Sequence, residues 1–136
     1  MLRTNIIDIR LLNSKSRMEA FVDVRMLGLW ASSKAATCTN EISECQDVMH
    51  FLLAAEELLL SGENERKVLV HLGCDVYEPG LCDLNGWIKI HLGAGIVIEM
   101  TYAEAKKYLT RRIRDLTDEI DELHKTMADC AALCSN

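Results

Sequence analysis

Two histidines and two cysteines lie close enough in this sequence to suggest a metal site. The tripeptide His-Leu-Gly occurs at 71–73 and again at 91–93, with Cys74 and Cys82 between the copies. Two residues separate His71 from Cys74, and eight separate Cys82 from His91. These are not common zinc-site spacings. If both copies lie in strands, side-chain alternation puts each histidine on the polar face of its strand. Cys74 falls on the other face, with the apolar residues. We therefore predict no metal site, with solvated histidines and a buried Cys74 thiol.

No other group of residues has the composition of a catalytic or cofactor site. The run GAGIVI at 93–98 is similar to a dinucleotide-binding loop, but it lacks the third glycine and leads into a strand-like stretch. A bound phosphate would therefore meet no helix N-terminus. No Ser-His-Asp, Cys-His or paired-carboxylate set converges on a pocket. We predict that the chain is not an enzyme and uses no cofactor.

The remaining cysteines fall on positions that helical seams would bury. Cys38, Cys45, Cys130 and Cys134 are best interpreted as small hydrophobic residues. A redox pair between Cys38 and Cys130, across two helices, is the alternative that stays open. Asp8 and Arg10 interrupt the first apolar stretch, which is untypical of a signal peptide. We therefore expect a cytoplasmic protein, with the nucleus as a further location, and reduced thiols.

Composition excludes two classes of partner. The net charge is −6, and the basic run at 111–114 is followed at once by the acidic run DLTDEIDE, which argues against nucleic acid. The longest apolar run, VMHFLLAAEELLL, is short and holds two glutamates, so it does not span a bilayer. Hydrophobic residues make up 49% of the chain but aromatic residues only 5%, and there is one proline. This profile favours long helices packed along a seam.

The clearest periodic signal lies in the last third of the chain. Thr101 with Glu104 forms a capping box, the sequence signature of a helix start. Apolar residues then alternate at spacings of four and three over more than three heptads, as in a coiled coil. We predict a helix from about 102 to 134 with the seam Leu109, Ile113, Leu116, Ile120, Leu123, Met127, Cys130 and Cys134.

The first half carries a matching seam. Ser16 with Glu19 is a second possible capping box, and Ser61-Gly62 is a plausible helix stop. We predict a helix over about 16–61, with residues 1–15 as a separate short element or a loose segment. Its seam, in which Gly28 and Glu56 are misfits, is Phe21, Val24, Gly28, Ala31, Ala35, Cys38, Ile42, Cys45, Met49, Leu52, Glu56 and Leu59.

Four short strands are predicted between the helices, over about 66–100. The runs KVLVHLG, DVYE, WIKIHLG and GIVIEM are β-branched or alternating and are separated by turn residues, which indicates two β-hairpins. Isolated hairpins are marginal in water and open strand edges invite pairing. We therefore predict an obligate oligomer that assembles through the in-phase residues Val68, Val70, Leu72, Ile88, Ile90, Leu92, Ile96 and Ile98.

The two helices should pair antiparallel, because their seams are similar in length and join the same β-structure. Placing Leu59 near Lys106 puts Ala35 near Cys130 and leaves off-seam apolar residues at the far end. These are candidate client or partner residues, since methionine-rich surfaces suit varied partners. The alternative is that they seal the tip or contact residues 1–15. The candidates are Met26, Leu27, Leu29, Trp30 and Leu133.

The sequence around the hairpins resembles the α-type subunits of prefoldin, and within that family the UXT (ubiquitously expressed transcript) proteins. One strand ends in Leu72-Gly73-Cys74, a second in Gly93-Ala94-Gly95, and an apolar strand runs over 96–99. Thr101 and Glu104-Ala105 then lead into the last helix. This resemblance covers residues 66–112 and, in pattern, the C-terminal helix.

The resemblance implies a single α+β domain, an antiparallel two-helix coiled coil on a base of two β-hairpins. It implies assembly into a hetero-hexamer with other prefoldin or prefoldin-like subunits. It further implies an ATP-independent chaperone that holds unfolded actin or tubulin chains at its coiled-coil tips. The alternative it leaves is a UXT-like adaptor or transcription cofactor in a complex linked to RNA polymerase assembly.

Overall fold

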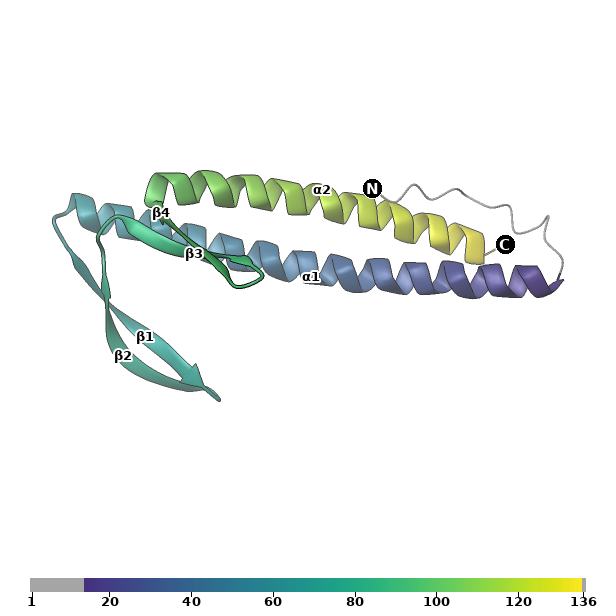
Figure 1. The fold of residues 1–136 in the computed structure, drawn as a ribbon, viewed down its shortest axis with the longest axis horizontal. Coiled ribbons are helices and arrows are strands. Elements are labelled where there is room, and N and C mark those ends of the chain that lie inside the picture. The colour runs from purple at the N-terminus through teal and green to yellow at the C-terminus, as the bar shows by residue number, and fades with distance from the viewer. Residues whose placement is uncertain (1–13, 136) are drawn as a thin grey trace. The chain divides into compact units, whose positions relative to one another are not determined.

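The computed structural model describes residues 14–135, apart from the side chains of residues 14–17, 19 and 21. Two long helices enclose four strands in sequence, and each strand pairs antiparallel with its neighbour to give two separate hairpins (Figure 1). The predicted fold class, two long helices joined by two hairpins, is confirmed. The elements are α1 (Ser14–Leu60), β1 (Glu65–Gly73), β2 (Val76–Asp83), β3 (Trp87–Gly93), β4 (Ile96–Thr101) and α2 (Tyr102–Cys134).

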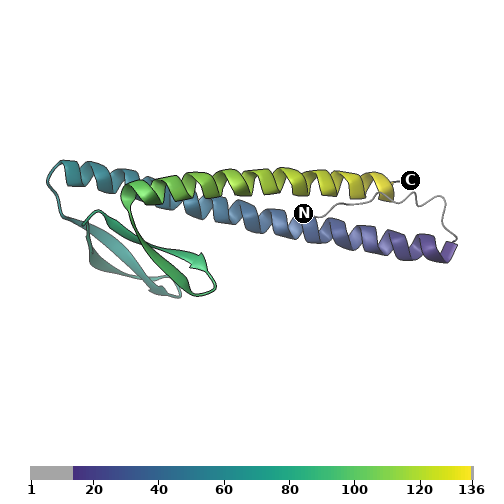
Figure 2. The same cartoon turned by 45° about the horizontal axis from the view of Figure 1, so that its top comes forward.

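The chain divides into two compact units, and each contains part of both helices. The helical unit consists of α1 up to Glu44 and α2 from Arg112 onward. The hairpin unit comprises Cys45–Arg111, with both hairpins. Within each unit α1 and α2 lie side by side, as two viewing directions show (Figures 1 and 2). Neither helix offers, in its described residues, an apolar stretch that could span a lipid bilayer.

The core of the helical unit is the predicted seam. Small residues of α1 pack against larger residues of α2, which lets the two backbones approach closely. An ion pair of 2.7 Å between Arg112 Nη2 and Glu41 Oε1 lies beside it. The buried residues are Ala31, Ala35, Cys38, Leu116 and Leu123, with Ile42, Ile120 and Met127 packed against them.

The register of the two helices differs from the predicted one. A Cβ atom placed on Gly28 would lie 3.4 Å from Cβ of Cys130, so Cys130 lies against Gly28 and not near Ala35. The offset is one heptad, and a seam of alternating three and four spacings looks the same after that shift. In the hairpin unit the difference is smaller: Lys106 Nζ lies 2.8 Å from Glu56 Oε2, one helical turn from the predicted neighbour Leu59.

The shifted register makes the proposed Cys38–Cys130 pair wrong. Cys130 lies against Gly28, and Cys38 is ten residues further along α1, roughly 15 Å at the helical rise. All six cysteines lie within the described residues, and none is in a disulfide.

The core of the hairpin unit joins the helices to one hairpin. It contains two fully buried alanines, which give the β-residues room to pack on the helices. Leu84, in the connection between β2 and β3, is 2% exposed, and its backbone N–H donates to the carbonyl of Asn64 at 2.7 Å. The buried residues are Leu52, Ala55, Leu84, Ile90, Tyr102, Ala105 and Leu109.

The helix ends in this unit have the predicted caps. The Glu104 N–H donates to Thr101 Oγ1 at 3.2 Å and the Thr101 N–H to Glu104 Oε2 at 3.1 Å, so the capping box is confirmed. At the end of α1, Gly62 has φ +84° and the Glu63 N–H donates to the carbonyl of Leu58, which is a Schellman motif.

The start of α1 is only partly described. The helix begins at Ser14, two residues before the predicted cap at Ser16. The side chains of Ser16 and Glu19, and the segment expected to form a separate element before the helix, lie outside the described residues.

Candidate interaction surfaces

The two hairpins share one backbone design. In β1–β2 the loop residues Cys74 and Asp75 have φ +47° and +59°, and in β3–β4 Ala94 and Gly95 have +50° and +74°. Two successive left-handed residues are typical of the type I′ turn. The pairing register shifts between residues 71 and 73 and again between 91 and 93, which leaves each His-Leu-Gly leucine at a bulge. The repeated tripeptide therefore marks the same bulge and turn in both hairpins.

Hairpin β3–β4 has one apolar face and one mixed face. The cross-strand pairs Ile88–Met100 and Ile90–Ile98 share a face, and Ile90 is 9% exposed because it packs into the core of the hairpin unit. The opposite face carries Lys89 directly across from Glu99. This hairpin is therefore anchored to its own helices.

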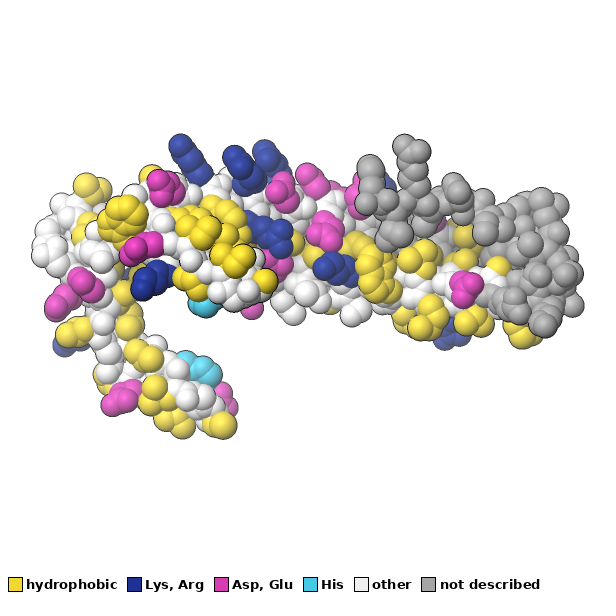
Figure 3. Space-filling view, in the orientation of Figure 1, with side chains coloured by type: hydrophobic (Ala, Val, Ile, Leu, Met, Phe, Trp, Pro, Cys, Tyr) yellow, Lys and Arg dark blue, Asp and Glu magenta, His cyan; other side chains and the backbone are white. Residues whose placement is uncertain are grey.

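Hairpin β1–β2 carries apolar residues on both faces, and most of their side chains are exposed to solvent. Val68 pairs with Gly80 on one face, while Leu69 pairs with Pro79 on the other. Leu69 is 70% exposed. Apolar side chains lie along this hairpin in the space-filling view (Figure 3). We call the second face the hairpin patch, which comprises Leu69, Tyr77, Pro79 and Leu81.

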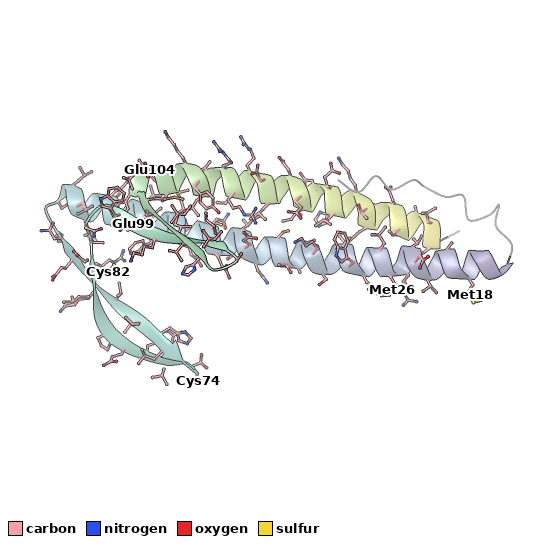
Figure 4. The ribbon with its side chains drawn as sticks, in the orientation of Figure 1. Met18, Met26, Cys74, Cys82, Glu99 and Glu104 are labelled. Atoms are coloured by element: carbon pink, nitrogen blue, oxygen red, sulfur yellow. The ribbon has the colours of Figure 1, made fainter. Side chains whose placement is uncertain are left out.

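This arrangement corrects the prediction of a buried Cys74, whereas His71 is exposed as predicted. His71 lies on the same face as the hairpin patch, and its ring is 5.0 Å from that of Tyr77. The supposed polar face is thus half apolar. Cys74 occupies the turn at the end of β1–β2 and is exposed, not buried (Figure 4). Strand alternation does not extend into a two-residue turn, which is why the phase of Val68 and Val70 misplaced it.

The predicted assembly residues divide between the hairpins. Ile88 and Ile90 pack against the chain's own helices, and Val68 is half-buried. The others are exposed within this chain, namely Val70, Leu72, Leu92, Ile96 and Ile98. Sequence reasoning missed the hairpin patch, although the unbroken apolar run Val68-Leu69-Val70 was a signal for a strand buried on both faces.

A second exposed apolar surface follows α1 in the helical unit. Four of its members recur at spacings of four, four and three and so share one side of the helix, and the fifth, Trp30, adjoins Leu29. Met18 and Met26 are 69% and 61% exposed and point away from α2 (Figure 4). We call this surface the outer stripe: Met18, Val22, Met26, Leu29 and Trp30.

The outer stripe contains only some of the predicted tip residues. Leu27 and Leu133 are half-buried, so they belong to the helix pair more than to the exposed surface. Met18 and Val22 were not predicted, because the predicted register placed the tip of the helix pair where residues 26–30 lie near Leu133. Their spacing with Met26 was the signal that could have identified them.

Burial makes the thiols of Cys38 and Cys130 poor nucleophiles. Desolvation raises the pKa of Cys38 above its ordinary value, and the nearby Glu119 carboxylate raises it further. Desolvation likewise raises the pKa of Cys130, with a contribution from Cys134. Among residues 14–135 no three His, Cys, Asp or Glu side chains come together as a metal site. The exposed surfaces that stand out among the described residues are the apolar ones, the hairpin patch and the outer stripe.

Comparisons with known proteins agree with this architecture. The sequence pattern described as prefoldin subunit matches residues 32–132. Prefoldin subunit 5 of Arabidopsis thaliana is 33% identical over 63 residues, 46% of this chain and 42% of that protein. This chain thus spans less than half the length of that curated relative.

A solved structure is similar over most of the chain. It is the cryo-EM structure of filamentous PFD from Methanocaldococcus jannaschii, with a TM-score of 0.63 and 20% identity. The likeness covers 84% of this chain and 91% of that one. At this identity it speaks for the fold.

Proposed function

Because the chain belongs to the prefoldin subunit family, we propose that it is a non-enzymatic subunit of a hetero-oligomeric, ATP-independent chaperone. It joins its complex through the hairpins and contacts unfolded or assembling proteins through the helical unit. The observation that carries this proposal is the β1–β2 hairpin, whose hairpin patch is apolar and exposed in the single chain.

A hairpin of this kind is unfavourable without partners. A lone two-stranded hairpin is at best marginally stable in water, and open strand edges pair readily. Burying apolar side chains contributes about 1.5–3 kcal/mol each. Covering the hairpin patch with other subunits would therefore stabilise both the hairpin and the complex.

Replacing Leu69 and Leu81 together with serine tests this assembly role. The double variant should lose co-purification with partner prefoldin subunits and shift to lower mass in light scattering. The matched control is Leu60→Ser, since Leu60 is 90% exposed at the end of α1 and outside the hairpin patch. Normal assembly of the Leu69/Leu81 variant would contradict the proposal.

The outer stripe is the proposed surface for clients such as unfolded actin or tubulin. Two of its members are methionines, whose flexible thioether side chains adapt to different partners. Replacing Met26, Leu29 and Trp30 with serine should weaken suppression of client aggregation without affecting assembly. Leu53→Ser is the control, because Leu53 is an exposed apolar residue of α1 in the other unit. Unchanged suppression by the triple variant would remove the outer stripe from the proposal.

A UXT-like adaptor or transcription cofactor is the second candidate. It is supported by the run Leu72-Gly73-Cys74 and by the sequence from Gly93 to Ala105, which resemble that subfamily. Affinity purification from cytoplasm and nucleus separates the candidates. Five other prefoldin subunits with actin or tubulin would support the chaperone, whereas RNA polymerase subunits would support the adaptor.

A further inference from the structure

Hairpin β1–β2 has two open edges, one along each strand. Within the described part of the chain, β1 pairs only with β2, so each of these strands leaves one row of backbone groups without a strand partner (Figure 1). Open edges of this kind accept an added strand through main-chain hydrogen bonds. The two edges are not equivalent, because β2 contains the single proline of the sequence, Pro79.

Pro79 shows which backbone groups of the hairpin face outward. In an antiparallel pair, opposite residues alternate between pairs that exchange two N–H···O bonds and pairs that exchange none. Proline has no N–H, so Leu69–Pro79 is a pair of the second kind. By alternation the pairs two residues to either side are of the same kind. One of them is His71–Tyr77, whose rings lie 5.0 Å apart, which agrees because side chains lie closer in such pairs.

The outward backbone groups of β1 form a complete edge, and those of β2 do not. Residues in pairs without mutual bonds direct their N–H and C=O groups away from the paired strand. On β1 these residues are Lys67, Leu69 and His71, each of which has a donor and an acceptor. On β2 the corresponding row has Pro79 at its centre, where a ring methylene replaces the N–H. A strand added to β2 would therefore have a carbonyl without a donor, whereas a strand added to β1 would not.

We propose that another prefoldin-family subunit adds a strand to the β1 edge alone, and that Pro79 excludes strand addition at β2. This inference rests on the proposed assembly role of the hairpins and specifies the edge and the partner. The added strand would continue the face that holds the hairpin patch, because the side chain of Leu69 lies on that face. Leu69 is exposed, so the partner residue that fits opposite it is apolar.

Charge specifies a second position of the partner strand. Lys67 is exposed, and the residue directly across from it in its own hairpin is the neutral Leu81. Cross-strand pairs of opposite charge stabilise a sheet. The partner strand therefore has Asp or Glu opposite Lys67 and an apolar residue two positions away, opposite Leu69. Two copies of β1 paired about Leu69 would instead place Lys67 opposite His71, which offers no carboxylate.

Proline substitutions in the two outward rows test which edge is used. Leu69→Pro removes an outward N–H from β1 and Leu81→Pro removes one from β2, and neither removes a bond within the hairpin. Leu69→Ala and Leu81→Ala are the matched controls, which remove the same side chains and keep the N–H. Relative to alanine, proline should raise the Kd for partner subunits about tenfold at position 69 and less than about twofold at position 81. An equal effect at both positions, or a larger one at position 81, would overturn the edge assignment.

Amide exchange in the unsubstituted complex tests the same point. On assembly the exchange of the Lys67, Leu69 and His71 N–H groups should slow about tenfold or more, while that of Tyr77 and Leu81 should stay the same. Slowed exchange in the β2 row, or no change in the β1 row, would overturn this inference and leave the proposed assembly role standing. Failure to form any complex with other subunits would overturn both.

Carbodiimide coupling tests the chemistry of the partner strand. The reagent condenses an amine with a carboxylate in contact with it, so in the complex it should join Lys67 to Asp or Glu of another subunit. Lys106 and Glu56, which are 2.8 Å apart within the chain, are the internal reference pair. A product that joins Lys67 to a second copy of this chain, or no product between subunits while Lys106 reacts, would overturn the acidic strand of a different subunit as the occupant.

Discussion

The two hairpins have the same backbone but present different chemistry at equivalent positions. Where β3–β4 has the pair Ile90–Ile98, with Ile90 in the core, β1–β2 has Val70–Glu78. On the opposite face, the charged pair Lys89–Glu99 corresponds to Leu69–Pro79.

The more apolar face of β1–β2 is thus the one equivalent to the charged face of β3–β4. Hairpin β3–β4 uses its apolar face to complete the core of its own subunit. Hairpin β1–β2 leaves the apolar residues of the hairpin patch in solvent. A repeated hairpin can therefore serve folding in one copy and, as proposed above, association in the other, because side-chain alternation lets each face change independently.

The largest expected contrast is between Ile90→Ala and Leu69→Ala in the isolated subunit. Ile90 is buried, so its truncation should lower the free energy of unfolding by about 2–5 kcal/mol. Leu69 is exposed, and its truncation should change that free energy by less than about 0.5 kcal/mol. Urea unfolding followed by circular dichroism measures both. Equal losses would show that β1–β2 is also part of the subunit's core.

Gly80→Ala should destabilise β1–β2 selectively. An added Cβ would lie 2.8 Å from Cγ2 of Val70, and a β-branched side chain has few alternative rotamers. Overpacking of this kind costs about 1–3 kcal/mol, and we expect the lower end because Val70 is partly exposed. Amide exchange should speed up in β1 and β2 only. The control is Gly28→Ala, where the 3.4 Å approach is ordinary contact and alanine favours a helix.

Reversing one charge tests the mixed face of β3–β4. Lys89→Glu would place two carboxylates directly opposite each other, because Lys89 pairs with Glu99 in the register. Directly opposed charges of one sign typically cost about 0.2–1 kcal/mol. The loss should shrink at high salt. A salt-independent loss would mean that Lys89 acts through packing.

Thiol chemistry should give the smallest effect. Cys38 and Cys130 have raised pKa values from burial, whereas Cys74 is exposed in its turn. Iodoacetamide should therefore modify Cys74 first and the two seam thiols last. Peptide mass spectrometry over time gives the order, and early modification of Cys38 would contradict the packed seam.

The same shifts set the sign of a pH effect. A pKa raised on folding means that the folded state holds the thiol proton more tightly. Its contribution to stability is present below the ordinary thiol value of 9.0 and is lost as the pH rises above it. Thermal unfolding should show a decline above about pH 9. Cys38→Ala should make that decline smaller.

Sequence reasoning predicted the elements because each had a local signal. The capping box at Thr101 and Glu104 and the glycine stop at Gly62 are decided within a few residues. The seam of α2 is decided by periodicity alone. Burial follows it closely, with Leu116 and Leu123 almost fully buried.

What could not be predicted depended on contacts between distant residues. The one-heptad offset in the helical unit is seen in the approach of Cys130 to Gly28, and periodicity does not contain it. Leu84 is buried because a loop passes over helical alanines. The hairpin patch emerges only when the turn at Cys74 fixes which residues of β1 and β2 are opposite each other.

The bond between the Leu84 N–H and the Asn64 carbonyl has a consequence for how this family can vary. It joins the two ends of segment 65–83, so hairpin β1–β2 begins and ends at one point beside the helices. Doubling the length of a closed loop costs only about 0.6 kcal/mol in entropy. The length and the side chains of this hairpin can therefore change, and with them the partners it fits, while the helices keep their fold.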